Sequence, residues 1–272
     1  MDTLSYYATQ SPFTDPGDYS SQLSELPKTV PELCGAIQGL CLDYAERYKY
    51  PIVNERLLVT NSRYVSKIIK EIFALNKAPL TEKREERDRF LASTSDFASL
   101  LCAALRLNGV PARKRVGFRT EEDGYRSLEL VEYWDGNGWQ QADPSGLLTG
   151  DFVPAAQAWQ MCRSGQADPE KFFDEESRGL VVVRANLILD LANMTKRELL
   201  NWDRYGWMNR PFEDFSDRAW EILDTLAELL AAGDEKLEEM QALYEREEGI
   251  QVPRVIWCAS PVVPPHKAEL TF

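Results

Sequence analysis

Apolar residues between positions 94 and 107 recur at three- and four-residue steps, which predicts a helix with one buried face. The polar run Ser93–Asp96 before it supplies side chains that suit the start of a helix. Gly109 and Pro111 predict its end, because glycine accepts a left-handed backbone and proline prevents the helix from resuming. The positions expected to be buried are Phe97, Leu100, Leu101, Ala104 and Leu105.

Strand-type patterns follow this helix directly. Residues 112–118 and 125–134 predict two strands. The sequence Asp135-Gly136-Asn137-Gly138 is typical of a hairpin turn, and it leads into a third strand at 139–143. The block 89–144 therefore predicts a central helix packed on an antiparallel sheet.

The rest of the chain is mainly helical in pattern. Residues 1–27 are expected to form an extended arm. The run GLVVVR at 179–184 predicts a short buried strand, and 250–259 predicts a strand that Pro253 would restrict to a sheet edge. Further helices are expected at 31–48, 63–76, 153–163, 185–193, 196–202, 216–232 and 234–248.

Composition and charge narrow the class of protein. The 272 residues suffice for one large domain or two associated ones, and 44% are hydrophobic and 28% charged. A net charge of −13 argues against nucleic acid or an anionic membrane as partner, because both require a basic surface. With no bilayer-spanning apolar stretch and no leader sequence, a cytoplasmic location is expected.

The sequence gives little support for a metal site or a cofactor site. The chain has one histidine, His266, which is expected to lie in a solvated, proline-rich tail. None of the five cysteines has metal-ligand spacing, and an odd, scattered set suggests reduced thiols. We therefore expect neither a metal nor a cofactor.

The helix–strand–strand block resembles the core of the transglutaminase-like superfamily, which is related to the papain-type thiol enzymes. The matching words are DFASLLCAALRLNGVPAR, VEYWDGNGW and ADP. A resemblance to a bacterial subgroup of stand-alone members adds the segments SPFTDPG, QGLCLD and RGLVVVRANLILDLANMTKRELLNWD. The resemblance implies an α+β fold with a papain-like core. It also implies one domain over 1–272, with an N-terminal helical region over 1–88, a core over 89–144 and a C-terminal helical extension over 145–272.

The same resemblance indicates that the catalytic dyad has been replaced. The family cysteine falls on Thr94, the family histidine on Leu128, and the family aspartate on Asp143. A thiol at a helix N-terminus has a lowered pKa, but a threonine hydroxyl there still requires an adjacent base. Leu128 cannot act as that base. An ordinary transglutaminase or cysteine protease activity is therefore not expected.

Other polar groups of this region are candidates for a different chemistry. Thr94, Asp96, Glu132 and Asp143 form the predicted catalytic set, and the predicted substrate-binding residues are Leu128, Arg115, Tyr133 and Trp134. Each polar group also has a structural interpretation. Thr94 and Asp96 suit helix capping, Glu132 can pair with Arg113 or Arg115 across strands, and Asp143 can start a turn.

Two hypotheses are nearly equal at this point. In the first, the protein is a cyclase, isomerase or dehydratase of a biosynthetic pathway. It performs cofactor-independent acid–base chemistry on a small molecule at this site, with Asp143 slightly favoured as the acting acid. In the second, the protein is a non-catalytic pseudoenzyme that binds a ligand or a protein partner. Residual acyl transfer or amide hydrolysis through Thr94 is a distant third. An enclosed cavity near Thr94 and Asp143 would favour the first hypothesis, and a cavity filled by Leu128 would favour the second.

Overall fold

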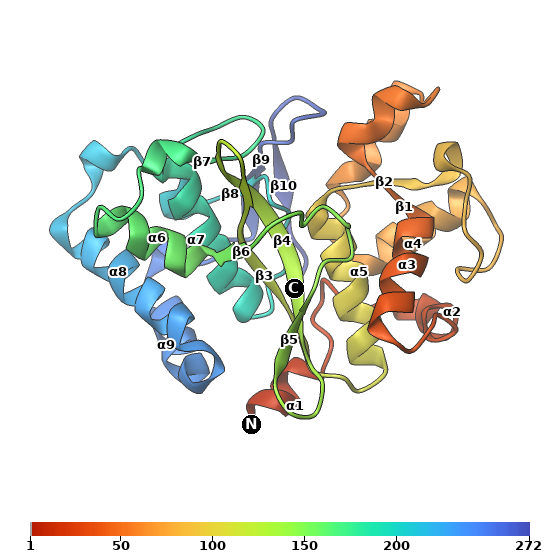
Figure 1. Ribbon diagram of the computed structural model, residues 1–272, viewed down its shortest axis with the longest axis horizontal. Coiled ribbons are helices and arrows are strands. Elements are labelled where there is room, and N and C mark those ends of the chain that lie inside the picture. The colour runs from red at the N-terminus through yellow and green to blue at the C-terminus, as the bar shows by residue number, and fades with distance from the viewer. Residues whose placement is uncertain (1) are drawn as a thin grey trace. The chain divides into compact units, whose positions relative to one another are not determined.

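The computed structural model describes residues 2–272, and the chain divides into two compact units. Strands β3 (Ala112–Glu121) and β4 (Gly124–Trp134) contribute residues to both (Figure 1). Unit 1 comprises Met1–Lys114, Leu130–Leu147 and Glu198–Asn201, and unit 2 comprises Arg115–Glu129, Leu148–Arg197 and Trp202–Phe272. Whether they form the single transglutaminase-like domain expected from the sequence stays a prediction.

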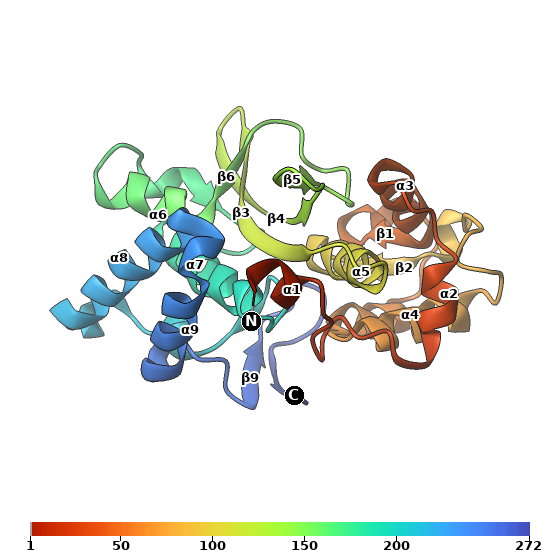
Figure 2. The ribbon, with the colours of Figure 1, turned by 90° about the horizontal axis from the view of Figure 1, so that it is seen from below.

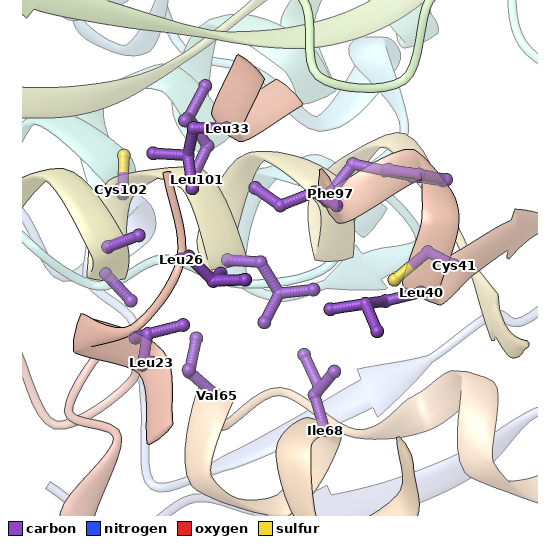
Figure 3. Packing of buried hydrophobic residues seen from close by; sticks show 14 of the residues in the cluster. Leu23, Leu26, Leu33, Leu40, Cys41, Val65, Ile68, Phe97, Leu101 and Cys102 are labelled. Carbon is purple, nitrogen blue, oxygen red and sulfur yellow. The ribbon is translucent and has the colours of Figure 1, made fainter. Parts of the chain in front are cut away.

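Unit 1 is built around helix α5 (Thr94–Leu107), in which every residue from Ser95 to Arg106 is buried. Figure 2 shows α5 among α2, α3 and α4, and Figure 3 shows apolar side chains of these helices pointing into one cluster. Burial on several sides explains why α5 is apolar around most of its circumference. The surrounding helices are α1 (Thr3–Tyr7), α2 (Ser20–Ser24), α3 (Val30–Leu40) and α4 (Val65–Leu75).

Strands precede and follow α5 along the chain. Immediately before the helix, β2 (Phe90–Ala92) pairs in parallel with β1 (Cys41–Asp43). After it, β5 (Trp139–Ala142) pairs antiparallel with β4, with Trp134 opposite Trp139. Ala112 and Val131 belong to the same apolar cluster as α5, so the helix packs on the sheet as predicted.

Unit 2 is built around helix α7 (Leu180–Met194), of which 13 of the 15 residues are buried. It packs against α6 (Ala155–Arg163) and α8 (Asp217–Ala232), and α9 (Leu237–Arg246) packs on α8. Two short strands extend the β3–β4 sheet here, β6 (Phe152–Pro154) antiparallel to β3 and β7 (Phe172–Phe173) parallel to β4. A separate antiparallel sheet has the order β10-β9-β8, formed by His266–Glu269, Val255–Cys258 and Asp203–Arg204.

The predicted α+β class, the central helix and the three antiparallel strands after it are confirmed. Helices over 63–76 and 216–232 are also present, with slightly shifted ends. Short 3-10 helices connect the larger elements at Gly17–Tyr19, Tyr44–Lys49, Asn54–Asn61, Glu86–Asp88, Pro169–Lys171, Gly206–Asn209, Phe212–Asp214, Gly233–Lys236 and Glu248–Ile250.

Several predicted elements were wrong. The run 179–184 is not a strand but the first turns of α7, because burial on all sides removes the periodicity that distinguishes a helix from a buried strand. Residues 196–202 are not helical, since Lys196 takes a left-handed backbone with φ 62° after α7 ends. The predicted helix 31–48 stops at Leu40, where the chain pairs with β2 instead.

The two chain ends also differ from expectation. The N-terminal arm contains the short helices α1 and α2. At the other end, β9 is the central strand of its sheet, because Pro253 lies before the strand rather than within it. His266, expected in a solvated tail, begins strand β10 and is half-buried.

Candidate functional site

The start of α5 is closed by a capping box rather than by Thr94. Ser93 is the N-cap, and its hydroxyl accepts a hydrogen bond from the Asp96 amide at 3.4 Å. In return, the Asp96 carboxylate accepts from the Ser93 amide at 2.7 Å and from the Ser93 hydroxyl at 2.9 Å. Both residues are buried. The Ser93 and Asp96 side chains therefore each accept from the other's amide, and these two amides would otherwise lack partners at the start of the helix.

Thr94, the predicted position of the family cysteine, is the first residue of α5 and is half-buried. Its place at the end of β2 and the start of a 14-residue helix puts its side chain in the positive potential of the helix dipole. This potential lowers the pKa of a thiol, but it cannot ionise a hydroxyl near neutral pH.

Glu132 and Arg113 form a buried ion pair across β3 and β4. The distance from Arg113 Nε to Glu132 Oε2 is 2.8 Å. The Arg113 guanidinium also lies 3.9 Å from the centroid of the Trp139 ring and 5.3 Å from that of Tyr7. Of the two pairings predicted for Glu132, the one with Arg113 is thus present. This cation, held by a carboxylate and two aromatic faces, fixes β4 against β3.

Asp143 follows β5 directly and starts a turn. Its Oδ1 accepts hydrogen bonds from the Ser145 amide at 2.8 Å and from the Ser145 hydroxyl at 2.5 Å. The side chain is half-buried. Helix α3 lies beside the turn, since Gln38 Nε2 donates to the Pro144 carbonyl at 3.2 Å. The turn-starting role predicted for this residue is therefore present in the structure.

The remaining predicted residues lie in two places. Leu128 and Arg115 belong to unit 2, where Leu128 is buried on β4 and Arg115 forms a bidentate ion pair with Asp190 of α7, with N–O distances of 3.1 and 2.9 Å. Tyr133 and Trp134 belong to unit 1. Tyr133 packs on the apolar cluster around α5, and Trp134 meets Trp139 edge to face with centroids 5.8 Å apart.

Sequence reasoning missed two buried polar clusters of unit 1. Lys114 Nζ donates to the Ser95 hydroxyl at 2.5 Å and to the Leu199 carbonyl at 2.6 Å. A serine beside a lysine can serve as nucleophile and base, but here both side chains are fully buried, so a substrate has no access. The only signal was the run of three basic residues Arg113–Arg115, which places charge on both faces of the strand and hides which side is buried.

The second missed cluster joins α5 to residues far along the chain. Arg106 Nη1 lies 2.8 Å from Glu198 Oε1, and neither side chain is exposed to solvent. Glu198 Oε2 also accepts from the Ser11 hydroxyl at 2.7 Å, and Arg106 donates to Thr14. The segment SPFTDPG, noted for its resemblance, thus contributes to a structural network in the core.

The cysteines lack the environment that activates a thiol. Burial, and secondarily the charge of Asp143, raises the pKa of Cys34 to about 11, and burial followed by the charge of Asp168 raises the pKa of Cys162 to about 11. Burial raises the pKa of Cys41 well above its usual value, with the Asp96 charge adding to the effect. Cys102 and Cys258 are fully buried.

We therefore expect slow labelling of the native cysteines by iodoacetamide at neutral pH, with no cysteine labelled rapidly. Because thiolate is the reactive form, the labelling rate of Cys34 and Cys162 should rise about tenfold per pH unit between pH 7 and pH 10, below a pKa of about 11. Mass spectrometry of timed samples measures this at each cysteine. Rapid labelling of one cysteine at pH 7, with a rate that levels off near neutrality, would contradict it.

Comparison with known proteins supports the class of this core. Residues 60–144, which include α5 and the strands after it, match the model of the transglutaminase-like superfamily. The resemblance noted in the sequence is confirmed for this segment, which is similar to the core of that superfamily. No curated protein and no solved structure matches the chain. The bacterial subgroup therefore stays a prediction.

Two further findings concern metal-binding clusters and membrane-spanning helices. Within residues 2–272, no cluster of three or more His, Cys, Asp or Glu side chains is arranged to hold a metal ion. In the same residues, no helix combines the length and apolar character that a bilayer span requires.

Proposed function

We propose that this protein is a non-catalytic member of the transglutaminase-like class that acts by binding. The observation that carries the proposal is that each predicted catalytic carboxylate has a structural partner. Asp96 caps α5, Glu132 neutralises Arg113, and Asp143 holds the turn at Ser145. In this proposal the three carboxylates that were predicted to be catalytic stabilise the core instead. Five free cysteines also suit a reducing compartment, so the cytoplasm is the proposed location.

Thr94 and Leu128 do not supply the thiol and the imidazole with which the thiol enzymes of the family act. Thr94 would need a base to remove its hydroxyl proton, and the position of the family histidine holds Leu128, which is apolar and buried. Acyl transfer through Thr94 therefore remains the weakest hypothesis.

Acid–base chemistry on a small molecule is the competing function. It needs a carboxyl group that is reachable and whose pKa is raised towards neutrality. An ion pair with arginine acts in the opposite direction, because a neighbouring cation favours the ionised form, and this disfavours Glu132. Asp96 is buried within its capping box. Asp143, which is half-exposed, is the residue on which the competing function depends.

Two substitutions of Asp143 separate these functions. Asp143→Asn keeps an oxygen that can accept from the Ser145 amide, whereas Asp143→Ala removes it. If the role is structural, Asp143→Ala should lower the free energy of unfolding by about 1 to 2 kcal/mol and Asp143→Asn by less. Urea unfolding measures both, with Ser145→Ala as the matched partner variant. Equal stability of all three variants and the wild type would count against the structural role.

A further inference from the structure

A pocket of about 400 Å³ lies within unit 2, and none of the residues that line it is a position of the family site. It is formed by the turn after β7, the first turns of α7, strand β8, the segment 208–212 and strand β9, elements that appear near one another in Figure 1. Its volume falls in the lower half of the range of small-molecule sites, about 300 to 1,000 Å³.

Arg184 of α7 is the most unusual residue in the pocket wall. It is 3% exposed, and its two terminal nitrogens donate to the carbonyls of Arg210 at 2.8 Å and Met208 at 3.0 Å. Its Nε is buried and has no hydrogen-bond partner. Within the portion of the chain that the structure describes, no carboxylate forms an ion pair with it. Burial alone lowers the pKa of this guanidinium to about 10, so the cation is desolvated without a compensating negative charge.

The other buried arginines show what is missing at Arg184. Arg106 is paired with Glu198, and Arg115 with Asp190, as buried charges require. Arg84 is also held mainly by carbonyls, and burial lowers its pKa, but the charges of Glu82 and Asp88 oppose this effect. Arg184 instead lies over the Phe212 ring at 4.1 Å and borders a cavity. An anion in that cavity would supply the missing counter-charge.

The charged residues that line the pocket favour a ligand with one negative charge over a ligand with two. Arg184, Arg204 and Arg210 contribute +3 and Asp174 and Glu176 contribute −2, which leaves +1 in a chain of net charge −13. Asp174 is already neutralised, since it lies 3.3 Å from Arg204 and accepts the amides of Glu176 and Ser177. Arg210 is exposed at the pocket and can turn towards a ligand. A monocarboxylate suits this balance better than a phosphate dianion.

The apolar side of the wall indicates the body of such a ligand. Val181 and Trp257 are among the large apolar side chains exposed to solvent, at 39% and 41%, and both border this pocket together with Phe212. Exposed apolar surface gathered beside a few polar groups is characteristic of a ligand site. A flat aromatic ring would cover Trp257 while its acid group faces the arginines.

We propose that this pocket binds a small aromatic monocarboxylate, with Arg184 and Arg210 facing the carboxylate and Trp257 and Val181 contacting the ring. This inference rests on the proposed binding function and names its site and class of ligand. Arg184 is a positioning residue as well as a charge, because the carbonyls of Met208 and Arg210 fix the orientation of its guanidinium.

The test is a titration of the full chain with a defined set of probes. Ligand-observed NMR measures the binding of each probe. The probes are benzoate, 3-phenylpropionate and indole-3-acetate, each compared with its neutral primary amide, and inorganic phosphate. At least one carboxylate should bind saturably, and its amide at least about tenfold more weakly. Arg210→Gln and Trp257→Ala should each weaken binding about tenfold, whereas Arg218→Gln, an exposed arginine of α8, should leave it unchanged.

Three outcomes would overturn the proposal. They are no saturation by any carboxylate below about 10 mM, equal affinity for acid and amide, and binding that Arg210→Gln and Trp257→Ala do not weaken. Phosphate binding without carboxylate binding would overturn the class of ligand. If binding fails while Asp143→Ala still lowers stability, this pocket is excluded and the non-catalytic role of the core stands. If a carboxylate binds saturably but the Asp143 variants are as stable as the wild type, the pocket stands as a ligand site and the structural role of Asp143 is excluded.

Discussion

Replacing Glu198 by glutamine should lower the free energy of unfolding by about 3 to 5 kcal/mol, the largest effect expected of a single substitution in unit 1. The Glu198 carboxylate and the Arg106 guanidinium are completely buried and 2.8 Å apart. The amide would leave Arg106 charged in the core without a counter-ion, and this costs far more than the pair itself contributes. Denaturant unfolding, monitored by circular dichroism, gives the difference.

Two comparison variants make this result specific. Glu238→Gln removes the same charge from an exposed position of α9 and should change stability by less than about 0.5 kcal/mol. Arg106→Met combined with Glu198→Met removes both charges and should recover much of the loss. A Glu198→Gln protein as stable as the wild type would show that the pair does not hold α5 to the segment around Glu198.

The second large effect concerns reactivity at Thr94, the predicted position of the family nucleophile. Thr94→Cys should produce a thiol that iodoacetamide labels on the order of 40-fold faster than Cys34 at pH 7.5. With a pKa of about 7.5 at the helix N-terminus, half of the new thiol would be ionised, whereas Cys34 with a pKa of about 11 would be ionised in roughly one molecule of every 3,000. Lower intrinsic nucleophilicity of the more acidic thiol offsets some of this advantage.

Ser164→Cys is the matched control for this measurement. Ser164 is the exposed C-cap of α6, where the helix dipole disfavours a thiolate. The two introduced cysteines thus differ chiefly in which helix end they occupy. Slower labelling of Cys at position 94 than at position 164 would mean that the start of α5 no longer has the geometry of an activating site.

Local pattern was a reliable guide where capping and turn residues mark the ends of an element, although α5 is buried on all sides and not on the one face that its spacing predicted. The bounds of α5 and of the hairpin formed by β4 and β5 followed from apolar spacing, capping residues and the Asp135–Gly138 turn. Pattern failed for α7, where β-branched residues fill the first turns and nearly every side chain is buried. In such a helix, tertiary packing outweighs both periodicity and intrinsic propensity.

The sequence suggested candidate positions, but their contacts could be predicted only in part. The resemblance to the family predicts Thr94, Leu128 and Asp143 as the positions of its triad, and the Arg113–Glu132 pair followed from neighbouring strands. The partners of Arg106 and Arg115 lie 92 and 75 residues away, and sequence alone does not bring such residues together. The environment of Arg184 was also hidden, since a missing counter-charge becomes visible only when the surrounding fold is known.

The central claim is that the three carboxylates predicted to be catalytic, Asp96, Glu132 and Asp143, stabilise the fold instead. Its most direct test is the unfolding free energy of the triple variant Asp96→Asn/Glu132→Gln/Asp143→Asn, compared with Glu221→Gln/Glu228→Gln/Glu238→Gln, which removes three exposed carboxylates. Loss of the buried ion pair, together with weakening of the capping box and of the turn at Ser145, should lower it by about 3 kcal/mol or more, while the control stays within about 1 kcal/mol of the wild type. A triple variant as stable as the wild type, or more stable, would contradict the claim, because unchanged or raised stability is typical of carboxylates kept for catalysis.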